Sequence, residues 1–152
     1  MVQQLTGGQK VTPGQGREPD VYDSVGFTPS LFGLNKFTVE AKTGNYTLQQ
    51  ADSGKMLTNR GAGAGVAIII TLPATGILGG FYVLVYVIAN ETVTVTTASL
   101  DTLITFNDAL ADSVAYSTVG EKIGGCFLVF YDGTAWAVAA LRYLNQTVTI
   151  TT

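Results

Sequence analysis

The residues best suited to chemistry in this sequence are three aspartates, Asp101, Asp108 and Asp112, which lie close together in the chain. Two carboxylates can act as general acid and base in glycoside hydrolysis, and a carboxylate cluster can bind calcium. The sequence contains no histidine, which excludes Ser-His-Asp and Cys-His catalysis and histidine metal sites. Asp108 and Asp112 stand where a turn or a helix start favours Asp, and the calcium-loop pattern D-x-[DN]-x-[DN]-G is absent. We therefore expect turn residues, no enzymatic activity, and neither a metal nor a cofactor.

Three other groups of residues suggest ligand sites but have simpler structural interpretations. The glycine-rich run Gly61–Gly65 lacks the following helix and the Lys-Ser/Thr pair of phosphate-binding loops, so we expect a flexible loop. Cys126 is the only cysteine and lies between glycines and apolar residues, as a small buried apolar residue would. Trp136 with Tyr131 and Tyr143 could stack on a sugar. Alternation along the strand favours a core position for Trp136, and the sugar platform remains the alternative.

The composition indicates a chain that shares its surface with partners. The 152 residues include eight Lys or Arg and eleven Asp or Glu, with a formal net charge of −3. Only 12% of the residues are charged, about half the usual share in globular proteins. No cluster of Lys and Arg occurs, so we do not expect a nucleic-acid partner. The longest apolar run, Phe81–Ala89, is too short to cross a bilayer as a helix, so we expect no membrane partner.

The same run, Phe81–Ala89, predicts the central strand of the fold. Side chains alternate along a strand, so the valines lie on one face and larger residues on the other. The first face comprises Val83, Val85 and Val87, and the second comprises Tyr82, Leu84, Tyr86 and Ile88. Because both faces are apolar, we expect each to be covered, either by a second sheet or by another subunit.

From residue 36 to residue 152 the sequence predicts an all-β domain, an antiparallel β-sandwich or jelly roll. Short apolar runs separated by turns suggest about ten strands, and no amphipathic helix period occurs. The expected strands are 37–41, 46–49, 55–58, 66–72, 81–89, 92–97, 102–106, 114–116, 126–131, 134–141 and 148–151. Asp132-Gly133 predicts a hairpin with a type I′ turn. Asn107–Asp112 could form a single helical turn capped by Asn107.

Residues 1–35 predict an extended arm. The segment contains Pro13, Pro19 and Pro29 but no lasting helical or strand period. Its short apolar groups would be of little use to a solvated linker, and we expect them to dock on a partner. The expected partner-binding residues are Val21, Tyr22, Phe27, Leu31 and Phe32. A disordered leader is the alternative.

Several short motifs, taken in order, resemble a β-module that recurs in virion proteins of tailed phages. They occur between about residues 45 and 140, at Asn45–Leu48, Ala51–Lys55, Ile70–Pro73, Gly80–Tyr82, Val93–Val95 and Asp132–Val138. The module is found in capsid decoration (cement) proteins, head fibres and tail-fibre tips. The resemblance implies that Asp52, Gly54 and Asp132-Gly133 form turns and that Trp136 is a core residue. It supplies no catalytic residue.

Resemblance, composition and arm together predict a structural virion protein. We expect a capsid decoration protein that forms a homotrimer on the capsid exterior, with the major capsid protein as its partner. A receptor- or sugar-binding head of a phage tail or head fibre is the alternative. A polysaccharide-degrading enzyme is a third possibility, and it depends only on the aspartates.

Overall fold

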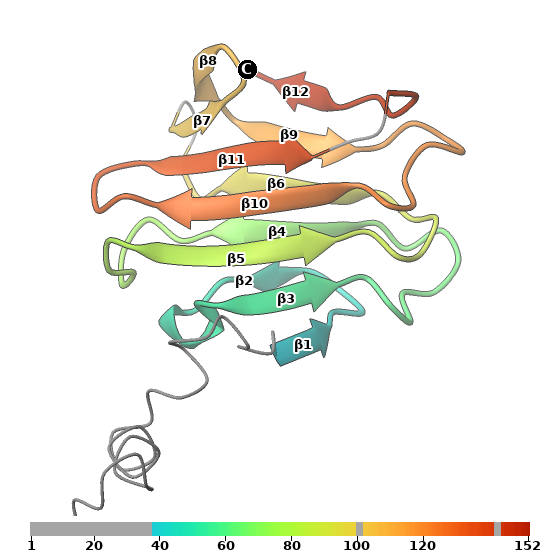
Figure 1. The fold of residues 1–152 in the computed structure, drawn as a ribbon, viewed down its shortest axis with the longest axis horizontal. Helices are drawn as coiled ribbons and strands as arrows, with labels where there is room; N and C mark the ends of the chain where they lie inside the picture. The colour runs from blue at the N-terminus through green and yellow to red at the C-terminus, as the bar shows by residue number, and fades with distance from the viewer. Residues whose placement is uncertain (1–37, 100–101, 142–143) are drawn as a thin grey trace, which may run out of the picture. The chain divides into compact units, whose positions relative to one another are not determined.

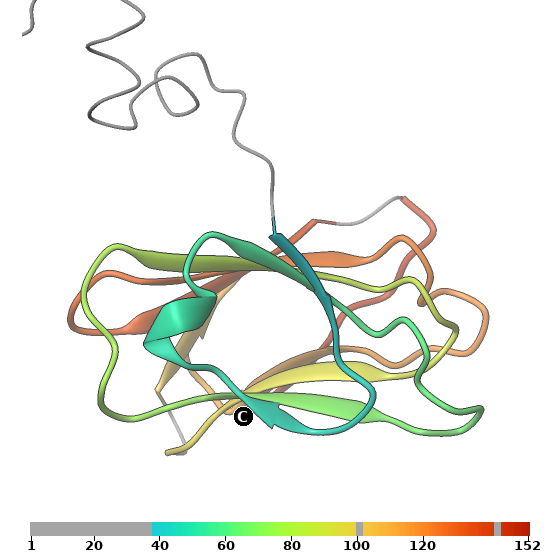
Figure 2. The ribbon, with the colours of Figure 1, turned by 90° about the horizontal axis from the view of Figure 1, so that it is seen from below.

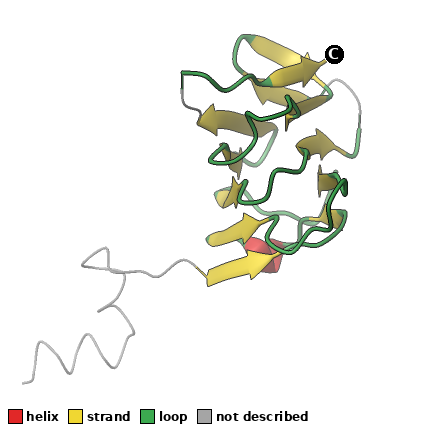
Figure 3. Ribbon diagram, turned by 90° about the vertical axis from the view of Figure 1, so that its right-hand side faces the viewer, coloured by secondary structure: helices red, strands yellow, loops and turns green. Residues whose placement is uncertain are grey.

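The computed structural model describes residues 38–99, 102–141 and 144–152. These residues form two β-sheets packed face to face (Figures 1 and 2). Their strands are β1 (Thr38–Ala41), β2 (Tyr46–Thr47), β3 (Lys55–Thr58), β4 (Ile68–Leu72), β5 (Phe81–Tyr86), β6 (Val93–Thr97), β7 (Leu103–Thr105), β8 (Asp108–Ala111), β9 (Ser113–Tyr116), β10 (Cys126–Tyr131), β11 (Trp136–Leu141) and β12 (Thr149–Thr151). A short 3-10 helix, η1 (Gln50–Asp52), is the red element of Figure 3. The expected all-β sandwich is confirmed, whereas the jelly-roll arrangement stays a prediction.

Several predictions concern residues outside the described part of the chain. They include the arm of residues 1–35 with its five candidate anchors, the domain boundary after residue 35, Asp101 and Tyr143.

The first six strands alternate between the two sheets. In the seven-stranded sheet β1, β3 and β5 are parallel neighbours, and in the five-stranded sheet β2, β4 and β6 are parallel neighbours. Each connection therefore crosses from one layer to the other, so strands that pair within a sheet run in the same direction. The expected antiparallel pairing is wrong for this half of the chain.

The later strands add the antiparallel pairs. β10 pairs with β5 and β11, and β9 pairs with β6 and β12. β7 lies parallel to β11 and antiparallel to β8. The sheet orders are β1-β3-β5-β10-β11-β7-β8 and β12-β9-β6-β4-β2, so β5 and β10 occupy the middle of the larger sheet.

The core lies between the inner faces of the two sheets. From the larger sheet it takes the alternate residues Leu57, Phe81, Val83, Val85, Leu103, Phe127, Val129, Trp136 and Val138. From the smaller sheet it takes Ile68, Ile70, Leu72, Val93, Val95, Val114 and Tyr116. The valine face of β5 is thus buried as expected. Its other face is not covered within the described residues, because Tyr82 is 46% exposed and Leu84 and Tyr86 are half-buried.

Tyr116 illustrates how closely this core is packed. Its side chain is fully buried, and its hydroxyl donates a hydrogen bond of 2.7 Å to the carbonyl oxygen of Leu141. The ring lies against Gly125, where an added Cβ would come within 2.7 Å of ring atoms. Only glycine at position 125 leaves room for the ring.

Two turns differ from the sequence predictions. The helical turn expected at Asn107–Asp112 is wrong, because β7 and β8 form a hairpin there with Phe106 at a φ of 50°. The hairpin between β10 and β11 is confirmed, but its loop has four residues, since Tyr131 pairs with Trp136. The Asp132 carboxylate accepts hydrogen bonds from the backbone amides of Thr134 and Ala135. This side chain organises a longer loop than a type I′ turn.

Candidate functional site

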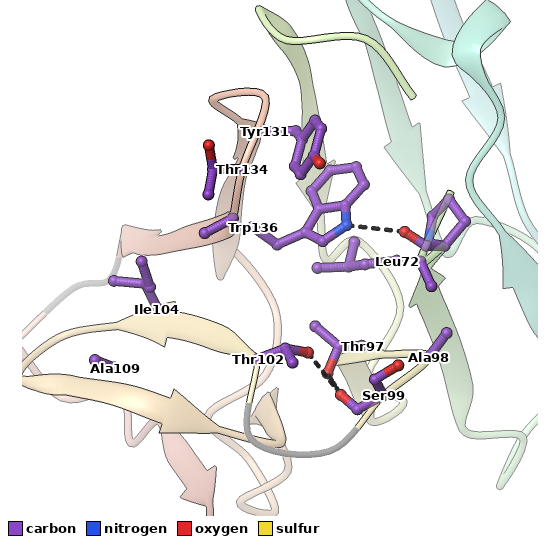
Figure 4. Close-up of a pocket in the computed structure, with 13 residues that line it drawn as sticks. Leu72, Thr97, Ala98, Ser99, Thr102, Ile104, Ala109, Tyr131, Thr134 and Trp136 are labelled. Atoms are coloured by element: carbon purple, nitrogen blue, oxygen red, sulfur yellow. Dashed lines mark hydrogen bonds between the residues drawn. The ribbon is translucent and has the colours of Figure 1, made fainter. Parts of the chain in front are cut away.

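A cleft lies at the end of the sandwich where β4, β6 and β10 end and β11 begins (Figure 4). Its volume is about 360 Å³. One side carries the aromatic residues Tyr131 and Trp136, and the other carries the hydroxyl residues Thr97, Ser99 and Thr102. None of the lining residues that the structure describes is charged. These described residues can offer hydrogen bonds and apolar contact to a small neutral molecule.

Trp136 is held in place as a core residue. Its indole nitrogen donates a hydrogen bond of 3.0 Å to the carbonyl oxygen of Pro73. Its ring packs edge-on against Phe81, with centroids 5.5 Å apart, and lies 4.9 Å from the ring of Tyr131. Only 5% of its surface is exposed. The preferred core position is confirmed, and Trp136 offers no open ring face for a sugar.

The aspartates do not form a catalytic pair or a metal site in the described residues. The Asp108 carboxylate accepts a hydrogen bond from the backbone amide of Leu110, which is the turn role expected for it. Asp112 contributes backbone hydrogen bonds to Thr97 and Thr151. No group of three His, Cys, Asp or Glu side chains close enough to hold a metal ion occurs in the described ranges. In the same ranges no helix is long and apolar enough to span a membrane.

The main charged cluster lies at the β1–β2 end of the sandwich and connects the two sheets. The fully buried Asp52 accepts hydrogen bonds from the hydroxyl of Tyr46 (2.9 Å), the Nζ of Lys55 (2.8 Å) and the amide of Gln49 (2.8 Å). Lys55 also donates to Glu40, 3.1 Å away. Because Tyr46 belongs to β2 and Lys55 to β3, Asp52 links the two layers.

The pKa values in this cluster follow from its hydrogen bonds. Burial alone would raise the pKa of Asp52, but the bonds from Lys55, Gln49 and Tyr46 outweigh it and hold that pKa below its usual value. Hydrogen bonds from Lys42 and Lys55 lower the pKa of Glu40. The carboxylates raise the pKa of Lys55. All these groups thus stay ionised near neutrality, which suits a structural cluster and not proton transfer.

The outer face of the seven-stranded sheet is the most extended candidate surface. Strand register aligns its outward side chains in three rows. The central row is Val39, Met56, Leu84, Leu128 and Ala139. One flanking row is Tyr82, Phe130, Ala137 and Ile104, and the other is Ala41, Thr58, Tyr86, Cys126 and Leu141, in which Thr58 is buried. No charged residue occurs in any row. The rows include side chains that are 40% or more exposed, namely Val39, Tyr82, Ile104, Phe130 and Leu141.

Cys126 lies on this face and is half-buried. The expected small apolar role fits its neighbours in the row, but the residue is less buried than the sequence suggested. Partial burial raises the pKa of its thiol, so the group is neutral and slow to react at neutral pH.

The outer face of the five-stranded sheet has a different character. Its register aligns Thr47, Thr71, Thr96, Ser113 and Thr151 in one row, and Ile69, Thr94, Ala115 and Thr149 in the next. All five residues of the first row carry a hydroxyl group, as do two of the four residues of the second row. Such a face can remain hydrated, because each hydroxyl can exchange hydrogen bonds with water.

Known proteins provide no direct guide to these surfaces. Comparison with protein-family models, curated proteins and solved structures gives no match. The cleft, the charged cluster and the sheet faces must therefore be interpreted from their geometry.

Sequence reasoning identified only one strand of the apolar face. It singled out Tyr82, Leu84 and Tyr86 on β5 but did not place β10 beside them. The signal was present in residues 126–131, where Cys126, Leu128 and Phe130 alternate with the core residues and none is charged.

Proposed function

We propose that this protein is a structural component of a tailed-phage virion, a decoration protein on the capsid exterior that binds the major capsid protein as a homotrimer. The observation that carries the proposal is the outer face of the seven-stranded sheet, whose three described rows from β1 to β7 contain no charged residue. A contiguous apolar face of this kind belongs in contact with protein, as it would be in a shell.

The resemblance to the virion module supports the same role through particular residues. Gly54 has a φ of 80° and Gly133 a φ of 105°, so both have backbone conformations suited to the turns that the resemblance implies. Trp136 occupies the core position that it implies. These agreements concern the scaffold, and the virion role is our inference from them together with the apolar face.

In this proposal the arm of residues 1–35 binds the capsid. Its candidate contact residues are Val21, Tyr22, Phe27, Leu31 and Phe32. The prolines of the arm restrict φ, which reduces the conformational entropy lost when the arm docks.

Deletion of residues 1–34 tests whether the arm binds the capsid. The truncated protein is expected to fold and to keep its oligomeric mass, but to cosediment with undecorated capsids at least tenfold more weakly than the full chain. Leu144→Ser is the matched control, since Leu144 is a fully exposed apolar residue of the domain; its binding should be unchanged. Undiminished capsid binding by the truncated protein would show that the arm is not the capsid contact.

The end cleft favours one second candidate, a receptor- or sugar-binding fibre head. The lining residues that the structure describes are uncharged and include several hydroxyl groups, which suits a small sugar. Ala98→Trp places a large side chain in the cleft. Loss of glycan binding in this variant, with capsid binding absent throughout, would support the fibre head over the decoration protein.

A further inference from the structure

We propose that β1 is a detachable strand, which the ionised Glu40 holds against the sandwich and which acid releases while the rest of the fold stays intact. The proposal concerns the conformation of the domain and does not depend on the virion role proposed above. Release of β1 adds its four residues to the chain that precedes Thr38, which lengthens that chain by about 13 Å when extended.

β1 has little apolar contact with the core. It is an edge strand of the seven-stranded sheet, and among the described strands it pairs with β3 alone (Figure 1). None of its four residues is buried. Val39 lies on the outer side of the sheet and is 62% exposed, whereas the register places Glu40 beside the core residue Leu57. A strand that adds no apolar side chain to the core belongs to the part of a fold that opens most easily.

Glu40 supplies the inner contact that an apolar residue supplies in the other strands. Its carboxylate accepts a hydrogen bond from the Nζ of Lys42, the residue after β1, and another from the Nζ of Lys55, 3.1 Å away on β3. Lys55 also donates to the buried Asp52, at 2.8 Å. The side chain of Glu40 therefore joins β1 to a charged group that is itself anchored in the domain.

Lys42 makes the attachment of β1 sensitive to the charge of Glu40. Only 9% of the Lys42 side chain is exposed, and its Nζ lies 3.3 Å from the ring centroid of Tyr46, on β2 of the other sheet. The carboxylate and the aromatic ring both stabilise the ammonium group in this position. If Glu40 loses its charge, the ammonium group loses its carboxylate partner. Its hydration then favours movement of Lys42 into water, and the end of β1 moves with it.

The groups that face Glu40 determine how it responds to acid. Hydrogen bonds from Lys42 and Lys55 hold the pKa of Glu40 below its usual value of 4.5. The contact is therefore fully present above the usual value and is lost as pH falls through the lowered one. The pKa of Asp52 is lowered as well, but its hydrogen bonds with Tyr46 and Lys55 join η1 to β2 and β3. Protonation of Asp52 thus weakens other contacts than those of β1.

Hydrogen exchange of single amides in the full-length protein, measured by NMR, tests the proposal. The reporter is the amide of Lys42, which donates to the carbonyl oxygen of Thr58 on β3 at 2.7 Å. Glu40→Gln removes the charge and nearly keeps the shape, and Glu91→Gln, between β5 and β6, is the matched control. At neutral pH we expect the protection of the Lys42 amide to fall at least fivefold in Glu40→Gln and to stay unchanged in Glu91→Gln.

Two other strands show whether the opening is local. The central strand β10 should keep its wild-type protection in Glu40→Gln. So should β12, which also buries none of its residues but makes no ion pair within the described chain. As the pH is lowered, wild type should lose protection at Lys42, relative to intrinsic exchange rates, until it equals Glu40→Gln.

Each other outcome overturns the proposal. Unchanged protection of Lys42 in Glu40→Gln would show that Glu40 does not hold β1, and an equal loss in Glu91→Gln would show that the charge acts without regard to its place. An equal loss in β10 would make Glu40 a contributor to global stability only. A wild-type Lys42 amide that is unprotected at neutral pH would mean that β1 is already open. If Glu40→Gln does not fold, acidified wild type decides alone: Lys42 must lose protection before β10, and simultaneous loss contradicts the proposal.

Discussion

The two sheets of this sandwich share one core but present opposite outer faces. On the seven-stranded sheet the aligned rows bring together Leu84, Leu128, Tyr82 and Phe130. On the five-stranded sheet the corresponding rows bring together hydroxyl residues such as Thr71 and Thr96. Both sheets bury their inner rows, so the difference between them lies in the outer rows alone.

The comparison shows how strand alternation separates stability from association. Inner residues contribute to the core whether or not a partner is present. Outer residues of the five-stranded sheet keep their contact with water, whereas those of the seven-stranded sheet release free energy only when another surface covers them. The apolar outer rows are therefore the best indication of assembly in the described chain.

Adjacent residues of β5 provide the largest expected contrast. Val85→Asp places a charge in the core, where Val85 is 2% exposed, and an unpaired buried charge costs several kcal/mol against a usual total stability of about 5 to 15 kcal/mol. We expect this variant not to fold. Leu84→Asp, one residue away on the outer face, is expected to fold as a monomer. Circular dichroism measures folding, and sedimentation measures the oligomeric mass. A cooperatively folded Val85→Asp would contradict the placement of Val85 in the core.

A medium effect is expected where the two sheets are joined. Asp52→Asn removes the charge that pairs with Lys55 but keeps an acceptor for Tyr46, and we expect a loss of about 3 kcal/mol at neutral pH. Urea unfolding at fixed protein concentration measures it.

The same cluster predicts an acid-sensitive fold. The pKa values of Asp52 and Glu40 are lower in the folded chain than their usual values of 3.8 and 4.5, so at low pH the unfolded chain binds more protons. Their contribution is fully present above the usual values and is lost as pH falls through the lowered ones. Asp52→Asn should lose less stability than wild type below pH ~4. An equally steep loss in both proteins would assign the acid sensitivity to other groups.

The smallest effect is expected on the hydroxyl face. Thr94→Val replaces one β-branched residue by another at a half-buried outer position, so the free energy of unfolding should change by no more than about 0.5 kcal/mol. The oligomeric mass should also stay the same. Leu128→Thr, which replaces an apolar residue by a hydroxyl residue on the apolar face, should weaken association. If both variants kept the oligomeric mass of the wild type, the two faces would not differ in their contribution to association.

Much of the scaffold could be predicted from the sequence because alternation is a local signal. The alternating runs at 81–86 and 126–131 indicated which of their residues are buried, and Asp132-Gly133 predicted the hairpin between β10 and β11. The winding between sheets could not be predicted, since the connection at 59–67 does not encode which layer the next strand joins. Asn59 shows why: its side chain bonds the amides of Ile88 and Ala89, some thirty residues away.

The candidate site was predictable only in part for a similar reason. The face of β5 was visible in its own sequence, but the apolar surface depends on pairing with β10, which lies far along the chain. The hairpin of β7 and β8 was missed because Asn107 suits a tight turn as well as a helix cap.

The most direct test of the central claim uses Cys126, the single cysteine, as a reporter within the apolar face. The rate at which a thiol reagent modifies Cys126 is measured in the wild type and in a Leu128→Glu variant, which carries a carboxylate at the centre of the apolar face, at the same concentration and pH. If copies meet through this face, the wild-type thiol should react at least tenfold more slowly than the thiol of the dissociated variant. Equal rates, with the wild type oligomeric by mass, would show that the copies meet elsewhere and would contradict the account.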